Sequence, residues 1–421
     1  MRNLLPLAVK SAWNRRLTLG LTLVSIALSV TMLLGVERLR NEAHNGFSQS
    51  VSGTDLVVGA RTSPIQLMLY AVFRIGEATN NMRWSSYKDI AQHPLVAWSV
   101  PISLGDSHHG FPVLGTTPAY FEHFRYGDAQ PLVMAQGKPF ANVFDVVIGA
   151  EVARALHYKL GDRITLSHGM GAAGLPEHGD KPFTVVGILL ATGTPVDRTL
   201  HVKLEAITAI HLDWVGGAAP MPGVSIPAEM VKKFDLAPKE ITAMLLGLKS
   251  RVAVFRMQRL INEYEKEALL GVMPGVALEQ LWQMVGVAEK SLLAVSAMVV
   301  VVGLSGLIAV ILASLNERRR ELAILRAVGA RPHEVFLLLT LEGLFITLSG
   351  VVLGVTLQAA LSFALAPLAL AQFGIALHPS LVSAEELQLL AAVVGIGMLA
   401  SLIPGYHAYK LSLSDGLTPR I

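Results

Sequence analysis

The segment from Asn316 to Glu334, NERRRELAILRAVGARPHE, is rich in charge and lies between two long apolar runs, 291–315 and 335–370. A run of about 20 apolar residues can cross the hydrocarbon core of a bilayer as a helix. A basic segment between two such runs cannot be a buried core element, because its charges would have to leave water. We therefore expect a short, helix-prone loop at the cytoplasmic surface, where another protein could act on it.

Composition and run length predict a membrane protein with a large outer domain. Apolar residues make up 52% of the chain and charged residues only 15%, whereas about a quarter of the residues of a soluble domain are charged. The expected fold class is an α-helical membrane domain of four transmembrane helices plus a large α+β extracytoplasmic domain inserted between helices 1 and 2. The expected boundaries are 17–36 for helix 1, 37–285 for the outer domain, 286–315 for the stalk end and helix 2, 335–370 for helix 3, 371–386 for a short outer loop and 387–407 for helix 4.

The distribution of Lys and Arg predicts the orientation, because cytoplasmic flanks keep an excess of both. Residues 1–16 carry four basic side chains and no acid, and 316–334 carries five arginines, whereas 371–386 has neither Lys nor Arg. Both termini, including the tail 408–421, are therefore expected in the cytoplasm of a bacterial cell, with the large domain outside its inner membrane. The run 17–36 exceeds the apolar core of a cleaved signal peptide, about 7–15 residues, so we expect an uncleaved span. The net charge of +3 then reflects topology and lipid contact, and no nucleic-acid partner is implied.

Strand and helix periods alternate in the outer region, which favours a mixed α+β domain. Short apolar segments ending in glycine or a turn predict strands at 55–59, 144–149, 183–189 and 243–248, whereas helical spacing appears at 151–157 and 251–266. Glycine-rich segments predict exposed loops at 169–181 and 216–227. No strong breaker separates 278–290 from the second span, so one helix is expected to run from the outer domain into the membrane.

The whole plan resembles the MacB/FtsX/LolC-type permeases of ABC transporters. The resemblance covers essentially the entire chain, and it is carried by ERRRELAILRAVGARP at 317–332 and by VIGAEVARAL at 147–156 followed by KLGD at 159–162. Residues 7–18 resemble the family's amphipathic helix leading into the first span, so a cytoplasmic amphipathic entry helix is expected at 1–16. Glu342 followed by Gly350 and Gly354 also fits the third span of the family.

This resemblance implies a permease that forms a homodimer and does not hydrolyse ATP itself. The sequence agrees, because it contains no G-x-x-x-x-G-K-[ST] phosphate loop. ATP would be bound by a separate cytoplasmic ABC ATPase subunit, and no cofactor is expected in this chain. In such relatives nucleotide-driven motion passes through the loop helix and the spans to the outer domain, where a periplasmic adaptor protein is a further expected partner. No Ser-His-Asp or paired-carboxylate pattern predicts catalysis.

The charged loop supplies the candidate residues for coupling to the ATPase. The arginines also satisfy the positive-inside rule and could contact anionic lipid headgroups. An amphipathic cytoplasmic helix either lies on the membrane or docks in a groove of a partner, and the resemblance favours docking. Gly329 is expected to end this helix, with Pro332 just beyond it. The candidates are Glu317, Arg318, Arg319, Arg320, Glu321, Leu322, Leu325, Arg326 and Gly329.

Three residues of the third span are candidates for roles inside the membrane. Glu342 is an acid within an apolar run, where a charge is costly and marks either a pairing site or a residue that snorkels to the surface. Gly350 and Gly354 form a G-x-x-x-G spacing, which allows two helices to approach closely, although glycine is frequent in such spans for other reasons.

Histidines in expected outer loops could bind a divalent metal or haem, because imidazole is a common metal ligand. His108 and His109 are adjacent, and His168 and His178 lie near Glu177 and Asp180. No tight ligand spacing such as H-E-x-x-H accompanies them. We assign no metal site from the sequence and keep His168 and His178 as candidates only.

Three functions fit these observations. The leading one is an efflux or extraction permease driven by a separate ATPase. The second is a signal relay that transports nothing and activates an outer partner. The third is a metal or haem handling permease that uses the histidine loops. The size of the outer domain favours the first.

Overall fold

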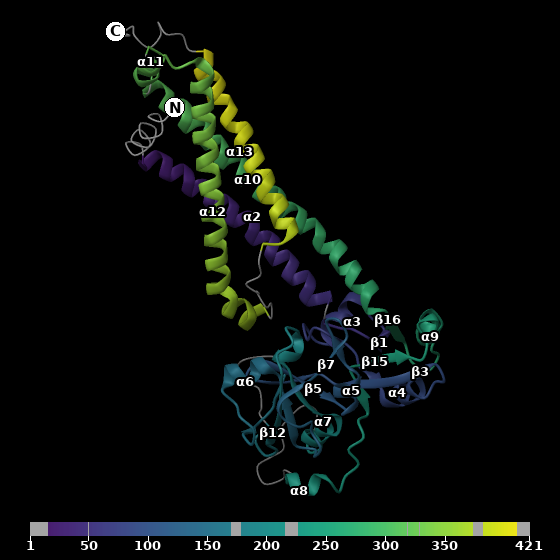
Figure 1. The fold of residues 1–421 in the computed structure, drawn as a ribbon. Helices are drawn as coiled ribbons and strands as arrows, with labels where there is room; N and C mark the ends of the chain where they lie inside the picture. Colours follow the sequence, from purple (N-terminus) through teal and green to yellow (C-terminus); the bar gives the residue numbers. More distant parts are fainter. Residues whose placement is uncertain are drawn as a thin grey trace. The chain divides into compact units, whose positions relative to one another are not determined.

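The structure, a computed structural model, describes residues 16–48, 50–169, 178–214, 226–317, 319–327, 329–373 and 382–410. The chain divides into two compact units, one helical and one α+β (Figure 1). Several predicted segments fall wholly or largely outside the described residues: the helix at 1–16, the tail after 410, and much of the loops 169–181, 216–227 and 371–386.

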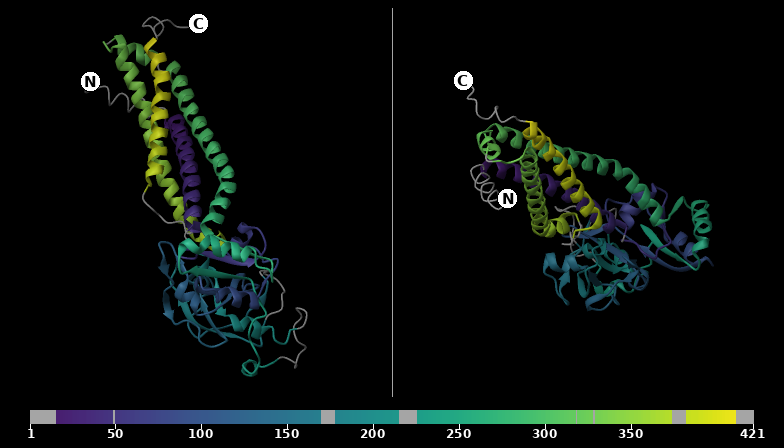
Figure 2. Two further views of the ribbon diagram at one scale, coloured as in Figure 1. Left: turned by 90° about the vertical axis from the view of Figure 1, so that its right-hand side faces the viewer. Right: turned by 45° about the horizontal axis from the view of Figure 1, so that its top comes forward.

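The helical unit is built on four long helices, each apolar and long enough to cross a membrane, and the left view of Figure 2 shows them running side by side. This confirms the four predicted membrane helices. They are α2 (Arg16–Ser48), α10 (Pro274–Glu317), α12 (Pro332–Phe373) and α13 (Ala384–Lys410), and the short helix α11 (Arg319–Ala327) lies between α10 and α12. All four extend beyond the apolar runs that predict them. Helix α10 is continuous, as its lack of breakers indicates.

Small residues bring α12 and α13 into close contact. A Cβ atom built on Gly343 would lie 2.5 Å from the Cβ of Ser401, and one on Gly397 would lie 2.5 Å from Cγ2 of Thr347. Apolar side chains gain little from leaving lipid, so membrane helices associate largely through close backbone packing of this kind.

The outer end of α13 carries a capping box. The Ser383 amide donates to Oε2 of Glu386 at 2.9 Å, and the Glu386 amide donates to Oγ of Ser383 at 3.1 Å. This reciprocal pair satisfies two amide groups that the first helical turn would otherwise leave without partners. Glu386 also pairs with Arg38 of α2, so the start of α13 is tied to α2.

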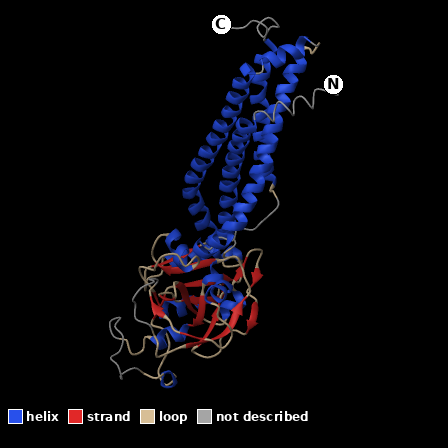
Figure 3. Ribbon diagram, turned by 90° about the vertical axis from the view of Figure 1, so that its left-hand side faces the viewer, coloured by secondary structure: helices blue, strands red, loops and turns tan. Residues whose placement is uncertain are grey.

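The α+β unit contains all the strands among the described residues (Figure 3), and it confirms the predicted mixed outer domain. Its first sheet is antiparallel with strand order β16-β1-β15-β3. These strands are β1 (Leu56–Ala60), β3 (Val96–Ile102), β15 (Ala243–Leu248) and β16 (Leu269–Val272). The helices associated with them are α3 (Pro64–Ala71), α4 (Trp84–Ala91) and α9 (Val254–Asn262), which follows the turn η2 (Arg251–Ala253).

The second sheet has the order β10-β12-β9-β13-β5-β4-β11, with β8 paired to β12. Pairs β9/β12 and β5/β13 are parallel, and the other pairs are antiparallel. The strands are β4 (Asp106–His108), β5 (Phe111–Thr116), β8 (Met134–Gly137), β9 (Asp145–Ile148), β10 (Arg163–Ile164), β11 (Ser167–His168), β12 (Phe183–Leu189) and β13 (Leu200–Lys203). Helices α6 (Ala150–Leu156) and α7 (Leu204–Ile210) and the turn η1 (Pro195–Arg198) accompany it, whereas α5 (Ala119–His123) lies against β3 of the first sheet.

The remaining elements are short. Strand β2 (Met82–Arg83) pairs with β14 (Glu240–Ile241), and β6 (Arg125–Tyr126) pairs with β7 (Gln130–Pro131). Helix α8 (Ala228–Val231) lies shortly after residues 215–225, which are outside the described residues. Gly149, which links β9 to α6, is required by packing, because a Cβ there would lie 2.3 Å from the carbonyl oxygen of Asp197.

Candidate functional site

Helix α11 (Arg319–Ala327) lies within the charged segment 316–334. The helix ends at Ala327. Gly329, just beyond it, has a φ of +108° that favours glycine, and its amide donates to the carbonyl of Arg326 at 3.1 Å. Leu322 and Ala323 are each only 5% exposed, and Leu322 belongs to the buried apolar cluster of the helical unit. Ile324 is 53% exposed. Leu322 is therefore used for packing within the chain, and Ile324 is an exposed apolar side chain that a partner could contact.

The other candidates for coupling are placed only in part. The backbones of Glu317, Arg319, Arg320, Glu321 and Leu325 lie in α10 or α11, Arg326 is half-buried, and Arg318 lies outside the described residues. Glu342 is half-buried in α12.

Gly350 and Gly354 face α2. A Cβ on Gly350 would lie 2.7 Å from Cγ2 of Ile26, and one on Gly354 would lie 2.7 Å from the Cβ of Val30. The hydroxyl of Thr31 donates to the carbonyl of Gly354 at 3.1 Å. The G-x-x-x-G spacing thus serves contact between two helices of one chain, and the exposed carbonyl left by a glycine becomes a hydrogen-bond acceptor.

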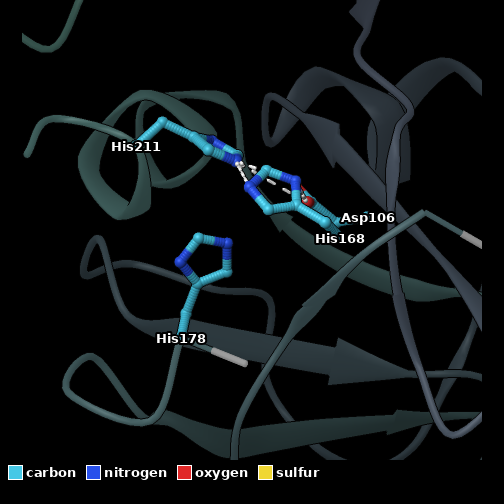
Figure 4. Close-up of side chains that lie close together, drawn as sticks. All are labelled: Asp106, His168, His178 and His211. Carbon is cyan, nitrogen blue, oxygen red and sulfur yellow. Dashed lines mark hydrogen bonds and ion pairs between the residues drawn. The ribbon is translucent and has the colours of Figure 1, made fainter. Parts of the chain in front are cut away.

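A cluster of three imidazoles and a carboxylate lies in the α+β unit (Figure 4). Asp106 begins β4 and is paired in register with His168 of β11. His211 caps the C-terminal end of α7, and His178 lies in the segment that leads to β12. We call these residues the histidine cluster: Asp106, His168, His178 and His211.

The ligand atoms of the histidine cluster all lie within 4.8 Å of one another. Nε2 of His211 is 3.0 Å from Nε2 of His168. Oδ1 of Asp106 is 3.3 Å from Nδ1 of His168 and 3.7 Å from Nε2 of His211. Figure 4 shows the His178 ring directed toward the same point.

Burial shapes the charge of this cluster. Asp106 is 4% exposed and His178 is fully buried. Burial lowers the pKa of His178 to about 4, against the opposing effect of Asp106, so the ring is neutral at neutral pH. Neither ring nitrogen of His178 has a hydrogen-bond partner among the described residues.

An aromatic ring lies beside the cluster, and the other carboxylates nearby are paired with a lysine. The Trp214 ring centroid lies 4.4 Å from those of both His168 and His178. The neighbouring carboxylates of Asp180 and Asp213 are both bound by the buried ammonium of Lys181, at 2.8 Å each. Asp180, which lies near His178 in sequence, is therefore paired with Lys181.

The structure brings together His168 and His178, as their sequence proximity suggests. Both ring nitrogens of His108 are used, one with the carbonyl of Thr165 at 2.6 Å and one with the hydroxyl of Tyr158 at 2.9 Å. His109 is exposed, and Glu177 lies outside the described residues. Asp106 and His211 were missed, because no spacing in the sequence links them and only strand pairing and the end of α7 bring them to this point.

Known proteins resemble the chain in both units. Residues 293–413 match the family model of the FtsX-like permease C-terminal region, and residues 17–217 match that of the MacB-like periplasmic core domain. The lipoprotein-releasing system transmembrane protein LolC of Neisseria meningitidis serogroup B is 24% identical over 348 residues, which are 80% of this chain and 76% of LolC.

Two solved structures are similar to part of the chain. The periplasmic region of MacB from Actinobacillus actinomycetemcomitans covers 58% of this chain and 97% of its own, with 12% identity and a TM-score of 0.32. The extracellular domain of the noncanonical ABC-type transporter YknZ from Gram-positive bacteria covers 52% and 99%, with 14% identity and a TM-score of 0.29.

The two family models follow one another along the chain in the order of its architecture, first the outer domain and then the later membrane helices. The LolC similarity extends over both. The chain therefore belongs to the MacB/FtsX/LolC family of ABC transporter permeases, as an inner-membrane protein with a periplasmic α+β domain.

Proposed function

We propose that this chain is a permease subunit that couples ATP hydrolysis by a separate cytoplasmic ABC ATPase to motion of its periplasmic domain. The observation that carries the proposal is the short helix α11, which connects two membrane helices directly. Leu322 anchors α11 in the helical unit, whereas Ile324 is exposed. A partner that moves α11 would therefore move α10 and α12 with it.

Helix α10 supports this mechanism because it can transmit displacement along its length. It contains 44 residues, which corresponds to about 66 Å at 1.5 Å per residue, about twice the thickness of the hydrocarbon core. It begins at Pro274, directly after the strand β16 that pairs with β1 in the first sheet. Rigid elements with two arrangements are what coupling of this kind requires.

The proposed work is extraction or export of a substrate on the periplasmic side by a homodimer of this chain with its ATPase. The relative LolC is named as part of a lipoprotein-releasing system, which favours a lipid-anchored substrate. The charge distribution of the loops supports cytoplasmic termini, because α11 and its flanks carry the arginine-rich segment.

Co-purification tests the proposal. The full chain is isolated in mild detergent from its native membranes, and the bound ABC ATPase is quantified by mass spectrometry for the wild type and Ile324→Asp. We expect the aspartate to reduce ATPase recovery at least tenfold, because a buried charge would face the docking groove. Val252→Asp in the periplasmic domain is the matched control, since Val252 is an 89% exposed apolar residue remote in sequence from α11.

Recovery of the ATPase should be unchanged in the Val252→Asp control. Equal recovery with Ile324→Asp and the wild type would exclude docking at α11. Absence of any ABC ATPase from the wild-type preparation would contradict the proposal as a whole.

A further inference from the structure

We propose that the periplasmic domain binds a divalent transition metal ion, with Zn²⁺ the best fit, through the four side chains of the histidine cluster: Asp106, His168, His178 and His211. The proposal goes beyond the permease function and does not depend on it, because all four residues lie in the α+β unit.

Three of the four ligand atoms are spaced as in a tetrahedral site. Zn²⁺ binds imidazole nitrogen and carboxylate oxygen at about 2.0–2.2 Å, so neighbouring ligand atoms of a tetrahedron lie about 3.3 Å apart. With Nδ1 of His168 as the ligand atom, it lies 3.3 Å from Oδ1 of Asp106 and 3.3 Å from Nε2 of His211, and Oδ1 of Asp106 lies 3.7 Å from Nε2 of His211. The ligand atom of His178 lies within 4.8 Å of these three, so a rotation of its ring would bring it onto the same ion.

Unsatisfied buried atoms indicate that a ligand belongs between these side chains. Both ring nitrogens of His178 and Oδ1 of Asp106 accept or donate no hydrogen bond among the described residues. A hydrogen bond between His168 and His211 would account for their close approach, yet it would leave His178 buried without a partner. A buried polar group without a partner destabilises the fold, and coordination of a metal by one of the nitrogens of His178 removes much of that cost.

The orientation of His211 also suits a metal ligand. Its Nδ1 lies 2.7 Å from the carbonyl oxygen of Ile207, to which Nδ1–H donates, so Nε2 presents its lone pair to the cluster. A hydrogen bond of this kind from the second ring nitrogen fixes the tautomer and the ring orientation of metal-binding histidines. Trp214 meets His168 edge-on and His178 at a tilt, and it covers the rings with apolar surface.

The ligand set selects the ion. Three imidazoles with one carboxylate suit Zn²⁺, whereas Ca²⁺ and Mg²⁺ require six or more oxygen ligands or retained waters. Cu²⁺ prefers a square-planar arrangement, and the ligand atoms here converge from β4, β11, the end of α7 and the segment that leads to β12. A bound ion would join these four segments, and so would raise the thermal stability of the domain.

Metal binding to the full chain in detergent tests the proposal. The protein is stripped with a chelator, exchanged into chelator-free buffer and titrated with Zn²⁺ by calorimetry, and in parallel with Co²⁺, whose four-coordinate complexes absorb strongly in the visible range. We expect one Zn²⁺ per chain and the visible bands of four-coordinate Co²⁺. His168→Ala and His211→Ala should each weaken Zn²⁺ binding by about 100-fold or more, since loss of outer-sphere partners alone costs about 10–100-fold.

His109→Asn is the matched control. His109 follows β4 directly, is exposed and has a φ of +48°, which asparagine tolerates. The Zn²⁺ affinity of the His109→Asn variant should therefore equal that of the wild type. Melting in excess chelator separates misfolding from loss of a ligand: His168→Ala should melt within a few degrees of the stripped wild type, and added Zn²⁺ should raise the melting temperature of the wild type and the control only.

Three outcomes would overturn the proposal. They are no Zn²⁺ binding by the stripped wild type, equal Zn²⁺ affinity in the wild type and both histidine variants, and a Co²⁺ complex that lacks the four-coordinate bands. None of these outcomes would affect recovery of the ATPase, which tests the proposed permease function separately.

Discussion

The guanidinium Nε of Arg38 in α2 lies 2.6 Å from Oε1 of Glu386 in α13, and the two side chains are only 13% and 3% exposed. Glu386 also accepts the Ser383 amide in the capping box. One carboxylate therefore both starts α13 and holds it to α2. Removing its cation would leave a buried charge without its counter-ion.

We predict that Arg38→Met destabilises the protein by about 3 kcal/mol, because breaking a buried ion pair leaves the remaining charge uncompensated. Melting of the full chain in detergent measures the effect. Adding Glu386→Gln should recover part of the loss, since the buried charge is then gone. Lys266→Met is the control, because its pair with Asp89 is exposed, at 72% and 45%, and an exposed ion pair is screened by water and contributes little. Equal effects of Arg38→Met and Lys266→Met would contradict this assignment.

Gly354→Ala is expected to destabilise the helical unit by about 1–3 kcal/mol, the usual cost of overpacking. The new Cβ would lie 2.7 Å from the Cβ of Val30 and 2.8 Å from the carbonyl oxygen of Ala27, so α2 and α12 would have to separate. Gly306→Ala provides the control, because a Cβ at that position meets nothing within 4 Å. Thermal melting should show a loss at Gly354 only. A neutral Gly354→Ala substitution would show that α2 and α12 do not pack closely here.

The ends of the membrane helices are not predictable from hydropathy. Hydropathy ends the first span at Val36, yet α2 continues to Ser48, because Glu37 and Arg38 are buried and paired with Arg40 and Glu386. Apolar runs report contact with lipid, whereas polar turns stabilised by tertiary ion pairs carry no such signal. The same holds for α11, where periodicity could not decide that Leu322 is buried and Ile324 exposed.

The strands were predictable where both sides are buried, and the histidine cluster was not. Segments such as β1 and β9 are fully buried and therefore read as continuous apolar runs. The cluster instead depends on the pairing of β4 with β11 and on the position where α7 ends. His108 has a sequence environment similar to that of His168, but its nitrogens are occupied by Thr165 and Tyr158.

Stability should fall with decreasing pH because of His201. This side chain is fully buried, and burial, followed by the nearby Arg74 charge, lowers its pKa from 6.5 to about 3. The folded protein keeps the ring neutral, whereas the unfolded chain takes up a proton below its ordinary pKa of 6.5. The contribution of His201 is therefore complete above pH 6.5 and decreases by about 1.4 kcal/mol per pH unit as the pH falls toward 3.

His201→Gln tests this dependence, because glutamine does not titrate. Melting with excess chelator at pH 6.5 and pH 5 should show that the wild type loses about 2 kcal/mol more than the variant over this interval. The comparison within one interval removes the contributions of the other histidines, which both proteins share. Parallel losses in the two proteins would mean that His201 is accessible to protons in the folded state.

The orientation of α11 can be tested by thiol labelling, since the chain contains no cysteine and any introduced thiol is the only one. Ile324→Cys and Val252→Cys place thiols at side chains that are 53% and 89% exposed. In intact cells with a permeabilised outer membrane, a membrane-impermeant maleimide should label Val252→Cys and leave Ile324→Cys unlabelled. The reason is that the arginine-rich flanks of α11 are retained on the cytoplasmic side.

The contrast between the two thiols should disappear when the inner membrane is opened. Inverted vesicles should show the opposite pattern, with Ile324→Cys labelled and Val252→Cys protected. Denaturation before labelling is the control for expression and thiol oxidation, and both variants should then react fully. Labelling of Ile324→Cys from outside intact cells would place α11 on the same side as the periplasmic domain. No cytoplasmic ATPase could then contact α11, and the proposed coupling would be excluded.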